Sequence, residues 1–230
     1  MTKLGIMGAM EEEIEPLLLN FENVNIVEYA NNKYYEVNYN GLDIVIAYSK
    51  IGKVFATLTV TTMIQRFGCD TILFSGVAGG IHPELKIGDL IIAEQLCQHD
   101  LDITAFGHAH GYVPGGDVCI PTTKHLREIA KTVAMDRDVK VIEGTIATGD
   151  QFVACEDKKN WIGKTFNAHA LEMEGASVAV VCNALDIDFL ILRAISDTAD
   201  MDADFNFDKF LETSARNSAD FIIKVVDKLI

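Results

Sequence analysis

The chain has 230 residues and a net charge of −15, and apolar residues make up 49% of it. This size fits one large α/β domain with a substantial core, and the composition is that of a soluble globular protein. The negative charge argues against binding of a nucleic-acid backbone, which requires clustered lysine and arginine. No apolar run reaches membrane-spanning length and no signal-peptide pattern opens the chain, so we expect a cytoplasmic protein.

Short apolar runs alternate with helical patterns from the start of the chain. Residues 4–7 predict a strand, followed by a turn and a helix that opens with three glutamates at 11–13, a charge that suits a helix N-terminus. This acidic start would repel a pyrophosphate, so a dinucleotide site is not expected. Residues 24–49 predict three strands joined by tight turns, because Asn-Asn and Asn-Gly pairs interrupt them.

The middle of the chain combines a glycine cluster with a long loop. A helix over 54–67 is followed by a buried strand over 71–75 and then by G-V-A-G-G at 76–80. Three glycines in five positions would let a ligand approach the backbone closely, and we favour this interpretation over a plain turn. After a strand over 88–95, the loop over 100–116 carries several apolar and aromatic residues, which is typical of a binding loop or an interface.

The five cysteines and the histidines give no metal-site pattern. The cysteines are scattered and form no C-x-x-C pair, which favours buried structural thiols over a zinc site or a disulfide framework. Cys97 and His99 could offer two metal ligands, but nothing completes a tetrahedral set. His108 and His110 lack a carboxylate partner, and we interpret them as pocket or surface residues.

The last third of the chain predicts a helix over 126–133, a strand over 139–148, a strand over 189–192 and an amphipathic helix over 207–229. No repeat, low-complexity tract or linker interrupts the alternation. We therefore predict an α/β fold, a single domain over 1–230 with a central mixed β-sheet flanked by helices.

Polar side chains follow the predicted strands, where ligands bind in open α/β folds. They are Glu13, Ser49, Glu172, Glu174, Arg193, Ser196 and Asp197. Carboxylates dominate, which suits acid/base chemistry on a neutral, hydroxyl-bearing substrate: one carboxyl group protonates a leaving group and another activates water. On the last strand alone, an ion pair between Arg193 and Asp197 or a capping role explains these residues equally well.

Seven motifs together carry a resemblance to a known family. They are G-I-M-G-A-M-E-E-E at 5–13, S-K-I-G-K at 49–53, G-V-A-G-G at 76–80, D-I-T-A-F-G at 102–107, A-T-G-D-Q-F-V at 147–153, L-E-M-E-G-A at 171–176 and R-A-I-S-D-T-A-D at 193–200. In this order the chain resembles the 5′-methylthioadenosine/S-adenosylhomocysteine nucleosidases of the purine nucleoside phosphorylase-like superfamily. The resemblance spans nearly the whole chain and implies a nucleoside phosphorylase-like fold.

The resemblance implies an activity. Such an enzyme hydrolyses the N-glycosidic bond of 5′-methylthioadenosine and S-adenosylhomocysteine, and of 5′-deoxyadenosine, releasing adenine in methionine salvage and S-adenosylhomocysteine recycling. Glu13 would be the base that activates water, with Arg193 near that water, and Asp197 would be the acid that protonates N7 of adenine. Members of the family use no metal or organic cofactor, so none is expected.

The resemblance also implies substrate contacts. Met173 and Glu174 would hold the ribose hydroxyls, Phe152 would stack on adenine and the Val153 backbone would read its Watson–Crick edge, with Gly79 and Ser196 among the substrate-binding positions. The resemblance assigns no role to Glu172, which we interpret as a supporting carboxylate. Met10, Ile51 and Phe207 would line the 5′-alkylthio pocket. In a homodimer, the partner subunit would close that pocket with its Ile103, Phe106 and Pro114.

Two residues depart from the family pattern, and both bear on substrate preference. Val77 stands where a small hydroxyl residue is common, and His108 replaces the usual tyrosine after A-F-G. The acid and the base are unaffected, but the ranking of 5′ substituents is open.

Three alternatives to this assignment predict different residues or a different substrate. Phosphorylases of the superfamily need arginines near the first glycine turn, where this chain has Met10 and three glutamates, so water is favoured over phosphate. Related hydrolases act on 6-amino-6-deoxyfutalosine, and the sequence does not separate the two substrates. A nucleoside sensor without activity would predict loss of Glu13 or Asp197, and both are present.

Overall fold

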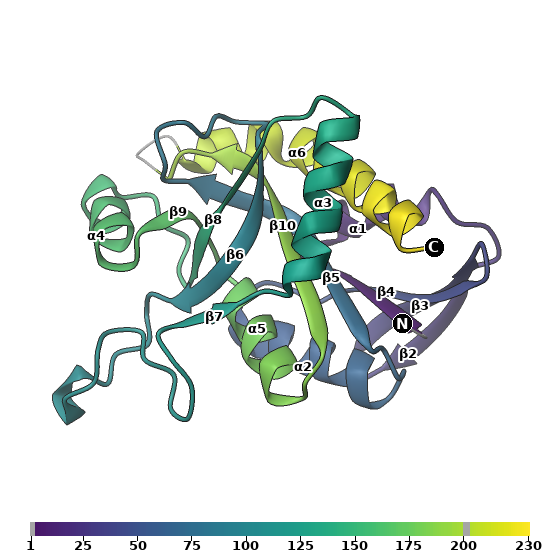
Figure 1. Ribbon diagram of the computed structural model, residues 1–230, viewed down its shortest axis with the longest axis horizontal. Helices are drawn as coiled ribbons and strands as arrows, with labels where there is room; N and C mark the ends of the chain where they lie inside the picture. The colour runs from purple at the N-terminus through teal and green to yellow at the C-terminus, as the bar shows by residue number, and fades with distance from the viewer. Residues whose placement is uncertain (1–2, 200–202) are drawn as a thin grey trace.

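A computed structural model describes residues 3–199 and 203–230, without the side chains of residues 204 and 205. Asp200, the last residue of the R-A-I-S-D-T-A-D motif, lies outside the described residues. Helices surround a mixed sheet in a single α/β domain, as predicted (Figure 1). The strands are β1 (Lys3–Gly8), β2 (Asn25–Tyr29), β3 (Asn32–Tyr39), β4 (Leu42–Tyr48), β5 (Thr71–Gly80), β6 (Leu90–Gln98), β7 (Cys119–Pro121), β8 (Val141–Thr148), β9 (Ala168–Glu172) and β10 (Asp188–Asp197). The helices are α1 (Glu11–Leu18), α2 (Lys53–Gln65), α3 (Lys124–Asp136), α4 (Glu156–Phe166), α5 (Gly175–Ala184) and α6 (Ala203–Leu229), with a short 3-10 turn at Thr104–Phe106.

Part of the sheet closes on itself. The strands β10, β6, β8, β9 and β5 follow one another by hydrogen bonding, and β5 pairs again with β10. From β5 the sheet continues outward through β1, β4, β3 and β2, and β7 adds to β6. The central pairs β5–β10, β5–β1 and β1–β4 are parallel. Their carboxyl ends therefore lie at one edge, where the loops that carry the predicted site residues begin.

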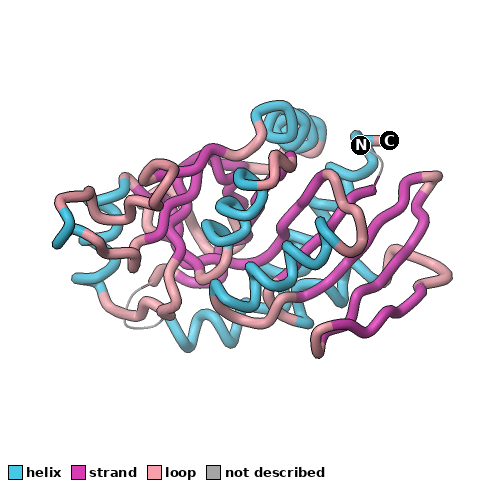
Figure 2. The backbone as a smooth tube through the Cα atoms, turned by 90° about the horizontal axis from the view of Figure 1, so that it is seen from below, coloured by secondary structure: helices cyan, strands magenta, loops and turns pink. Residues whose placement is uncertain are grey.

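Two apolar layers hold the helices on the sheet, because neighbouring strand residues point to opposite faces. On β5, Leu73 packs in one cluster with residues of α1, α3 and α6, and Phe74 packs in another with residues of α2 and α5. In Figure 2 the helices lie on both sides of the strands. No helix in the described part of the chain has the length and apolarity to cross a bilayer.

Most of the predicted elements are confirmed, including the three hairpin strands and the helices α2, α3 and α6. Two strands run further than predicted. The glycine cluster at 76–80 belongs to β5, and the polar residues 193–197 belong to β10, so neither segment is a loop. The sequence patterns assigned no element to α4 and β9. Only Ile162 and Phe166 of α4 are buried, which leaves a weak helical pattern.

Candidate active site

A cavity of about 390 Å³ opens at the carboxyl ends of the central strands, a size typical of small-molecule sites. Its wall comes from the turn after β1, the ends of β5 and β10, the loop after β8, the link between β9 and α5, and the start of α6. The lining residues are Ala9, Met10, Glu13, Ile51, Val77, Ala78, Gly79, Gln151, Phe152, Val153, Leu171, Glu172, Met173, Glu174, Ser196, Asp197, Phe207 and Asp208. Segments far apart in the sequence thus meet around one cavity.

Glu13 is buried at the cavity wall because α1 begins directly after β1. As the third residue of the helix, its side chain turns back over the helix start, where N–H groups lack helical partners. One carboxylate oxygen, Oε2, accepts hydrogen bonds from the N–H groups of Ala9 at 2.5 Å and Met10 at 3.2 Å. The other oxygen, Oε1, accepts one from the Val77 N–H at 2.9 Å. Backbone groups of the turn after β1 and of β5 therefore fix the orientation of this carboxylate.

The surroundings of Glu13 act on its pKa in opposite directions. Burial raises the pKa of Glu13, while the Arg193 charge and the N–H groups of Ala9, Val77 and Met10 oppose that rise. A raised pKa makes a carboxylate a stronger base, and the N–H donors keep it in one orientation. The backbone of Val77 makes its hydrogen bond without help from its side chain, so the departure from the family's hydroxyl residue leaves this contact intact.

Asp197 ends β10 on another wall of the cavity and is also buried. Its Oδ2 accepts a hydrogen bond from the Ser196 hydroxyl at 2.9 Å, and its Oδ1 accepts one from the Ala199 N–H at 2.8 Å. A side chain on Gly79 would place its first carbon 2.8 Å from Asp197 Oδ1. The glycine in β5 therefore makes room for the carboxyl group.

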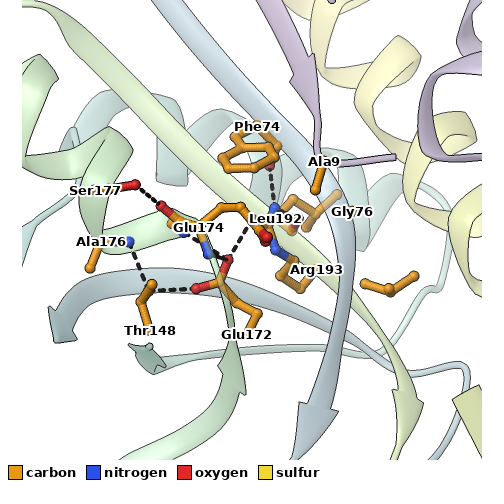
Figure 3. A network of polar contacts seen from close by, with 12 residues as sticks. Ala9, Phe74, Gly76, Thr148, Glu172, Glu174, Ala176, Ser177, Leu192 and Arg193 are labelled. Atoms are coloured by element: carbon orange, nitrogen blue, oxygen red, sulfur yellow. Dashed lines mark hydrogen bonds and ion pairs between the residues drawn. The ribbon is translucent and has the colours of Figure 1, made fainter. Parts of the chain in front are cut away.

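Arg193 pairs with Glu172 and not with Asp197 (Figure 3). The Nη2 atom of Arg193 lies 2.8 Å from Glu172 Oε2, and both side chains are at most 3% exposed. The Nη1 atom donates to the carbonyl oxygen of Phe74 at 3.1 Å, and the guanidinium carbon lies 3.9 Å from the centre of the Phe74 ring. These contacts explain how a charged residue is accommodated inside a strand, and they place Arg193 behind the cavity wall rather than on it. Its predicted contact with water stays a prediction.

Glu172 connects this pair to the segment that carries Glu174. Its Oε1 accepts a hydrogen bond from the Thr148 hydroxyl, and its Oε2 accepts bonds from the Gly175 N–H at 2.8 Å and the Glu174 N–H at 3.2 Å. Glu172 thus fixes the turn from β9 into α5, as expected for a supporting carboxylate.

Glu174 lies at the start of α5, and its Oε1 accepts a hydrogen bond from the Gly52 N–H at 2.8 Å. Burial, together with the nearby Glu172 charge, raises the pKa of Glu174 to about 8. The motif at 49–53 therefore reaches the cavity through its backbone. Ser49 itself does not line it, because the Ser49 hydroxyl donates to the Lys50 carbonyl at 2.7 Å.

The predicted aromatic and apolar residues also line the cavity. The rings of Phe152 and Phe207 meet edge to face with centroids 5.6 Å apart. Met10, Ile51, Val153 and Met173 are among the other lining residues. Five lining residues were not predicted from the sequence: Ala9, Ala78, Gln151, Leu171 and Asp208. Their signal was present, since most of them fall inside or next to the seven motifs.

Three predicted residues lie outside this cavity. Ile103, Phe106 and Pro114 belong to the segment 99–118 between β6 and β7, which we call the arm. It extends away from the sheet at the lower left of Figure 1. Phe106 is 80% exposed, and His108 stacks on Tyr112 within the arm at a centroid distance of 4.6 Å. The chain's own cavity is thus not closed by its own arm.

The fold and the cavity define a class of protein: an α/β enzyme whose small-molecule site is mostly apolar and is lined by the buried carboxyl residues Glu13, Glu172, Glu174 and Asp197. No group of three or more metal-ligating side chains occurs among residues 3–199 and 203–230. The model of the phosphorylase superfamily matches residues 3–227. The chain therefore belongs to the phosphorylase superfamily.

Similar proteins within this superfamily are nucleosidases. The chain is 51% identical to an aminodeoxyfutalosine nucleosidase of Campylobacter jejuni over 100% of both chains. It is 36% identical to a 5′-methylthioadenosine/S-adenosylhomocysteine nucleosidase of Anoxybacillus flavithermus over 98% of both. A crystal structure of a Helicobacter pylori mutant nucleosidase with 5′-methylthioadenosine in its active site is 45% identical, covers 99% of both chains and superimposes with a TM-score of 0.98. The predicted family resemblance is confirmed, and the chain is an enzyme of the nucleosidase type.

Proposed function

We propose that the chain, as one nucleosidase domain over 1–230, hydrolyses the N-glycosidic bond of adenine nucleosides that carry a 5′ extension. The substrates are 5′-methylthioadenosine, S-adenosylhomocysteine and 5′-deoxyadenosine, and the name of the Campylobacter jejuni relative adds 6-amino-6-deoxyfutalosine. One observation carries the proposal: Glu13 and Asp197 line the same cavity, Glu13 beside Gly76 and Asp197 beside Gly79 of β5. The two glycines are three residues apart, which is about 10 Å along a strand, so the carboxyl groups approach the cavity at different points of β5.

The two carboxyl groups divide the chemistry. N–H groups orient both carboxylate oxygens of Glu13. Glu13 takes a proton from water as the water oxygen bonds to C1′ of the ribose. Asp197 gives a proton to N7 of adenine as the bond between N9 and C1′ breaks. The sugar carries positive charge at the transition state, and the buried carboxylates stabilise that charge. Arg193, behind the wall, moderates the pKa of Glu13 and orients Glu172.

The remaining wall residues orient the substrate. Glu174 and Met173 contact the ribose hydroxyls, and Ser196 holds the Asp197 carboxyl group. Phe152 stacks on adenine while the Val153 backbone contacts its edge, and Gly79 lets the base approach Asp197. The apolar side chains of Met10, Ile51 and Phe207 receive the 5′ substituent. In a cell this reaction would serve methionine salvage and S-adenosylhomocysteine recycling, in the cytoplasm.

A homodimer completes the site in this proposal. Helix α2 and the turn before it present an apolar outer face beside the cavity, where Ile51, Val54, Phe55 and Leu58 are 45–77% exposed. Exposed apolar groups that cluster in this way mark interaction surfaces. The arm carries the strongly exposed Phe106 away from its own sheet, so its apolar residues Ile103, Phe106 and Pro114 are available to close the 5′ end of the partner's cavity.

The test is an adenine-release assay on 5′-methylthioadenosine, S-adenosylhomocysteine, 5′-deoxyadenosine and 6-amino-6-deoxyfutalosine, each with and without phosphate. We expect turnover that does not depend on phosphate, because the described cavity wall carries carboxylates and no arginine or lysine. Turnover that requires phosphate would instead identify a phosphorylase. Binding of all four compounds without adenine release would identify a nucleoside sensor.

A further inference from the structure

Two of the five cysteines face each other across neighbouring strands. In the antiparallel pair of β6 and β7, Cys97 is the register partner of Cys119. Both side chains pack in the same apolar cluster, with Ile162 and Phe166 of α4 among its members. Facing residues of an antiparallel pair project from the same face of the sheet, with Cβ atoms about 4.5–5.5 Å apart. The two thiols therefore lie side by side on one face of the sheet.

The hydrogen-bonding pattern of the strand pair brings these two positions close. The Thr122 N–H donates to the Glu94 carbonyl oxygen at 3.0 Å, so this facing pair is hydrogen-bonded. Pairs alternate along an antiparallel ladder, and Gln95 with Pro121 is consequently a pair without hydrogen bonds, as a residue lacking an N–H requires. Cys97 and Cys119 lie two residues further along the ladder, so they too form a pair without hydrogen bonds. Cα atoms of such pairs are about 4.5 Å apart, within the range of about 4.4–6.8 Å that a disulfide spans.

The two thiols differ in a way that suits sequential oxidation. Cys119 is partly exposed, and its interaction with the neighbouring Cys97 thiol lowers the pKa of Cys119. Cys97 is buried, and its contact with Cys119 raises the pKa of Cys97. Oxidants attack the thiolate form of an accessible cysteine first. The neighbouring thiol is then in place to resolve the oxidised sulfur.

We propose that Cys97 and Cys119 are a redox modification site that closes reversibly into a disulfide and restrains the arm. The Cys119 thiolate attacks hydrogen peroxide, the O–O bond breaks, and Cys119 becomes a sulfenic acid as hydroxide leaves and takes up a proton. The Cys97 sulfur then attacks the Cys119 sulfur, the S–O bond breaks, and the oxygen leaves as water with the Cys97 proton. Two thiols are oxidised by two electrons, and one peroxide is reduced to two waters.

The position of the Cys97–Cys119 disulfide determines its effect on the arm. Cys97 is near the end of β6 and Cys119 begins β7, so the disulfide joins the two strands at the base of the arm 99–118. A covalent link at this point limits the separation of the arm's two ends and the fraying of the three-residue strand β7. The oxidised protein is therefore expected to hold its arm more rigidly than the reduced protein.

The experiment treats the native full-length protein with hydrogen peroxide, blocks free thiols and maps the peptides by mass spectrometry without reduction. We expect one linked pair, between the peptides that contain Cys97 and Cys119, and its loss on addition of dithiothreitol. Hydrogen exchange of residues 99–118 is expected to slow in the oxidised form and to recover on reduction.

Variants separate this pair from the other thiols. Cys119→Ser should abolish the linked peptide, and Cys155→Ser, at an exposed cysteine far from the pair in sequence, should leave it intact. Because Cys119 is partly exposed, its serine variant is expected to fold, and a thermal melt checks this. Oxidation confined to Cys155, or linked peptides shared among several cysteines, would overturn the site. An arm whose exchange is the same in both forms would overturn the restraint.

Discussion

The carboxyl group of Glu13 occupies the space that a side chain on Gly76 would need. A first side-chain carbon at Gly76 would lie 2.6 Å from Glu13 Oε1 and 3.0 Å from its carboxyl carbon. The backbone of Gly76 continues β5 without a left-handed conformation, so the requirement for glycine comes from space and not from torsion. Two acidic side chains lie against the end of β5, Glu13 at Gly76 and Asp197 at Gly79. They leave no space for a side chain at either position, which explains the glycines.

We expect Gly76→Ala to lower the rate of adenine release by about 10²-fold, because a displacement of about 1 Å in a catalytic group has an effect of that size. The added methyl group pushes the Glu13 carboxylate away from the Val77 N–H. Steady-state kinetics should show the loss in kcat. Gly116→Ala is the matched control, since its added carbon meets only the Val113 carbonyl oxygen at 3.6 Å. Wild-type kcat in a folded Gly76→Ala protein would contradict this role of the glycine.

Substitution of either catalytic carboxyl group tests the assigned chemistry directly. Glu13→Gln and Asp197→Asn should each lower kcat by about 10²–10⁴-fold, the contribution typical of a general acid or base. Both replacements keep the shape of the side chain, and a thermal melt should show a folded protein. Glu12→Gln, at the exposed neighbouring glutamate of the same helix turn, is the control and should keep wild-type activity. An Asp197→Asn protein that retains most of its activity would refute the acid role.

Local patterns predicted the hairpins, the long helices and the alternation of the α/β fold, because each depends on residues near in sequence. They misplaced the ends of β5 and β10, since glycines and charged residues normally end a strand. Here Arg193 continues β10 because Glu172 and the Phe74 ring receive its charge, and both come from other strands. Such compensation is visible only in three dimensions. The short strand β9 escaped detection because its pairing partners β5 and β8 determine it more than its own residues do.

For the candidate site, too, sequence motifs predicted some features, and others are visible only in the structure. Most residues on the cavity wall were predicted from motifs, whereas the role of Glu172 as partner of Arg193 could not be predicted from the sequence, where 21 positions separate the two residues. The alternative ion pair between Arg193 and Asp197 would join two residues on the same strand, β10. Asp197 instead bonds to Ser196 and Ala199 beside it. Proximity in sequence was therefore misleading for Arg193.

The buried pair of Glu172 and Arg193 should be important for stability. We expect Glu172→Gln to lower the free energy of unfolding by about 3–5 kcal/mol, because it leaves the Arg193 charge buried without its counterion. Glu36→Gln, which breaks the partly exposed pair with Lys3, should cost less than about 1 kcal/mol. Urea denaturation at a fixed protomer concentration measures both variants. Equal small losses would show that the buried pair contributes no more than a surface pair.

Glu174 should make stability depend on pH. Its pKa is raised from 4.5 to about 8 in the folded protein, so the folded state binds the proton more tightly than the unfolded state. The resulting stability is fully present below the unfolded pKa and is lost as pH rises toward about 8. Glu174→Gln removes this pH-dependent contribution to the free energy of unfolding. We expect the stability of the wild type relative to Glu174→Gln to fall between about pH 5 and pH 8, by at most about 1.4 kcal/mol per pH unit. A difference that stays constant over this range would show that Glu174 is ionised throughout.

The arm can be tested for its proposed action on the partner subunit. Phe106→Asp places a charge on the arm where an apolar contact is proposed, and we expect it to raise KM for 5′-methylthioadenosine while the protein stays folded. The ring of Phe106 is 80% exposed in the single chain, so a folding defect is not expected. An unchanged KM would mean that the arm does not reach the 5′ end of a cavity.

Mixed dimers decide whether the arm acts within its own chain or across the interface. We expect co-expression of Phe106→Asp chains with Asp197→Asn chains to restore a wild-type KM in a fraction of the sites. In the mixed dimer, the cavity of the Phe106→Asp chain keeps Asp197 and receives an intact arm from the other chain. Glu13→Gln chains mixed with Asp197→Asn chains are the control, because each cavity then lacks one catalytic carboxyl group and no site is restored. If mixed dimers purified with two different affinity tags show only the raised KM, the proposed exchange of the arm between subunits is wrong.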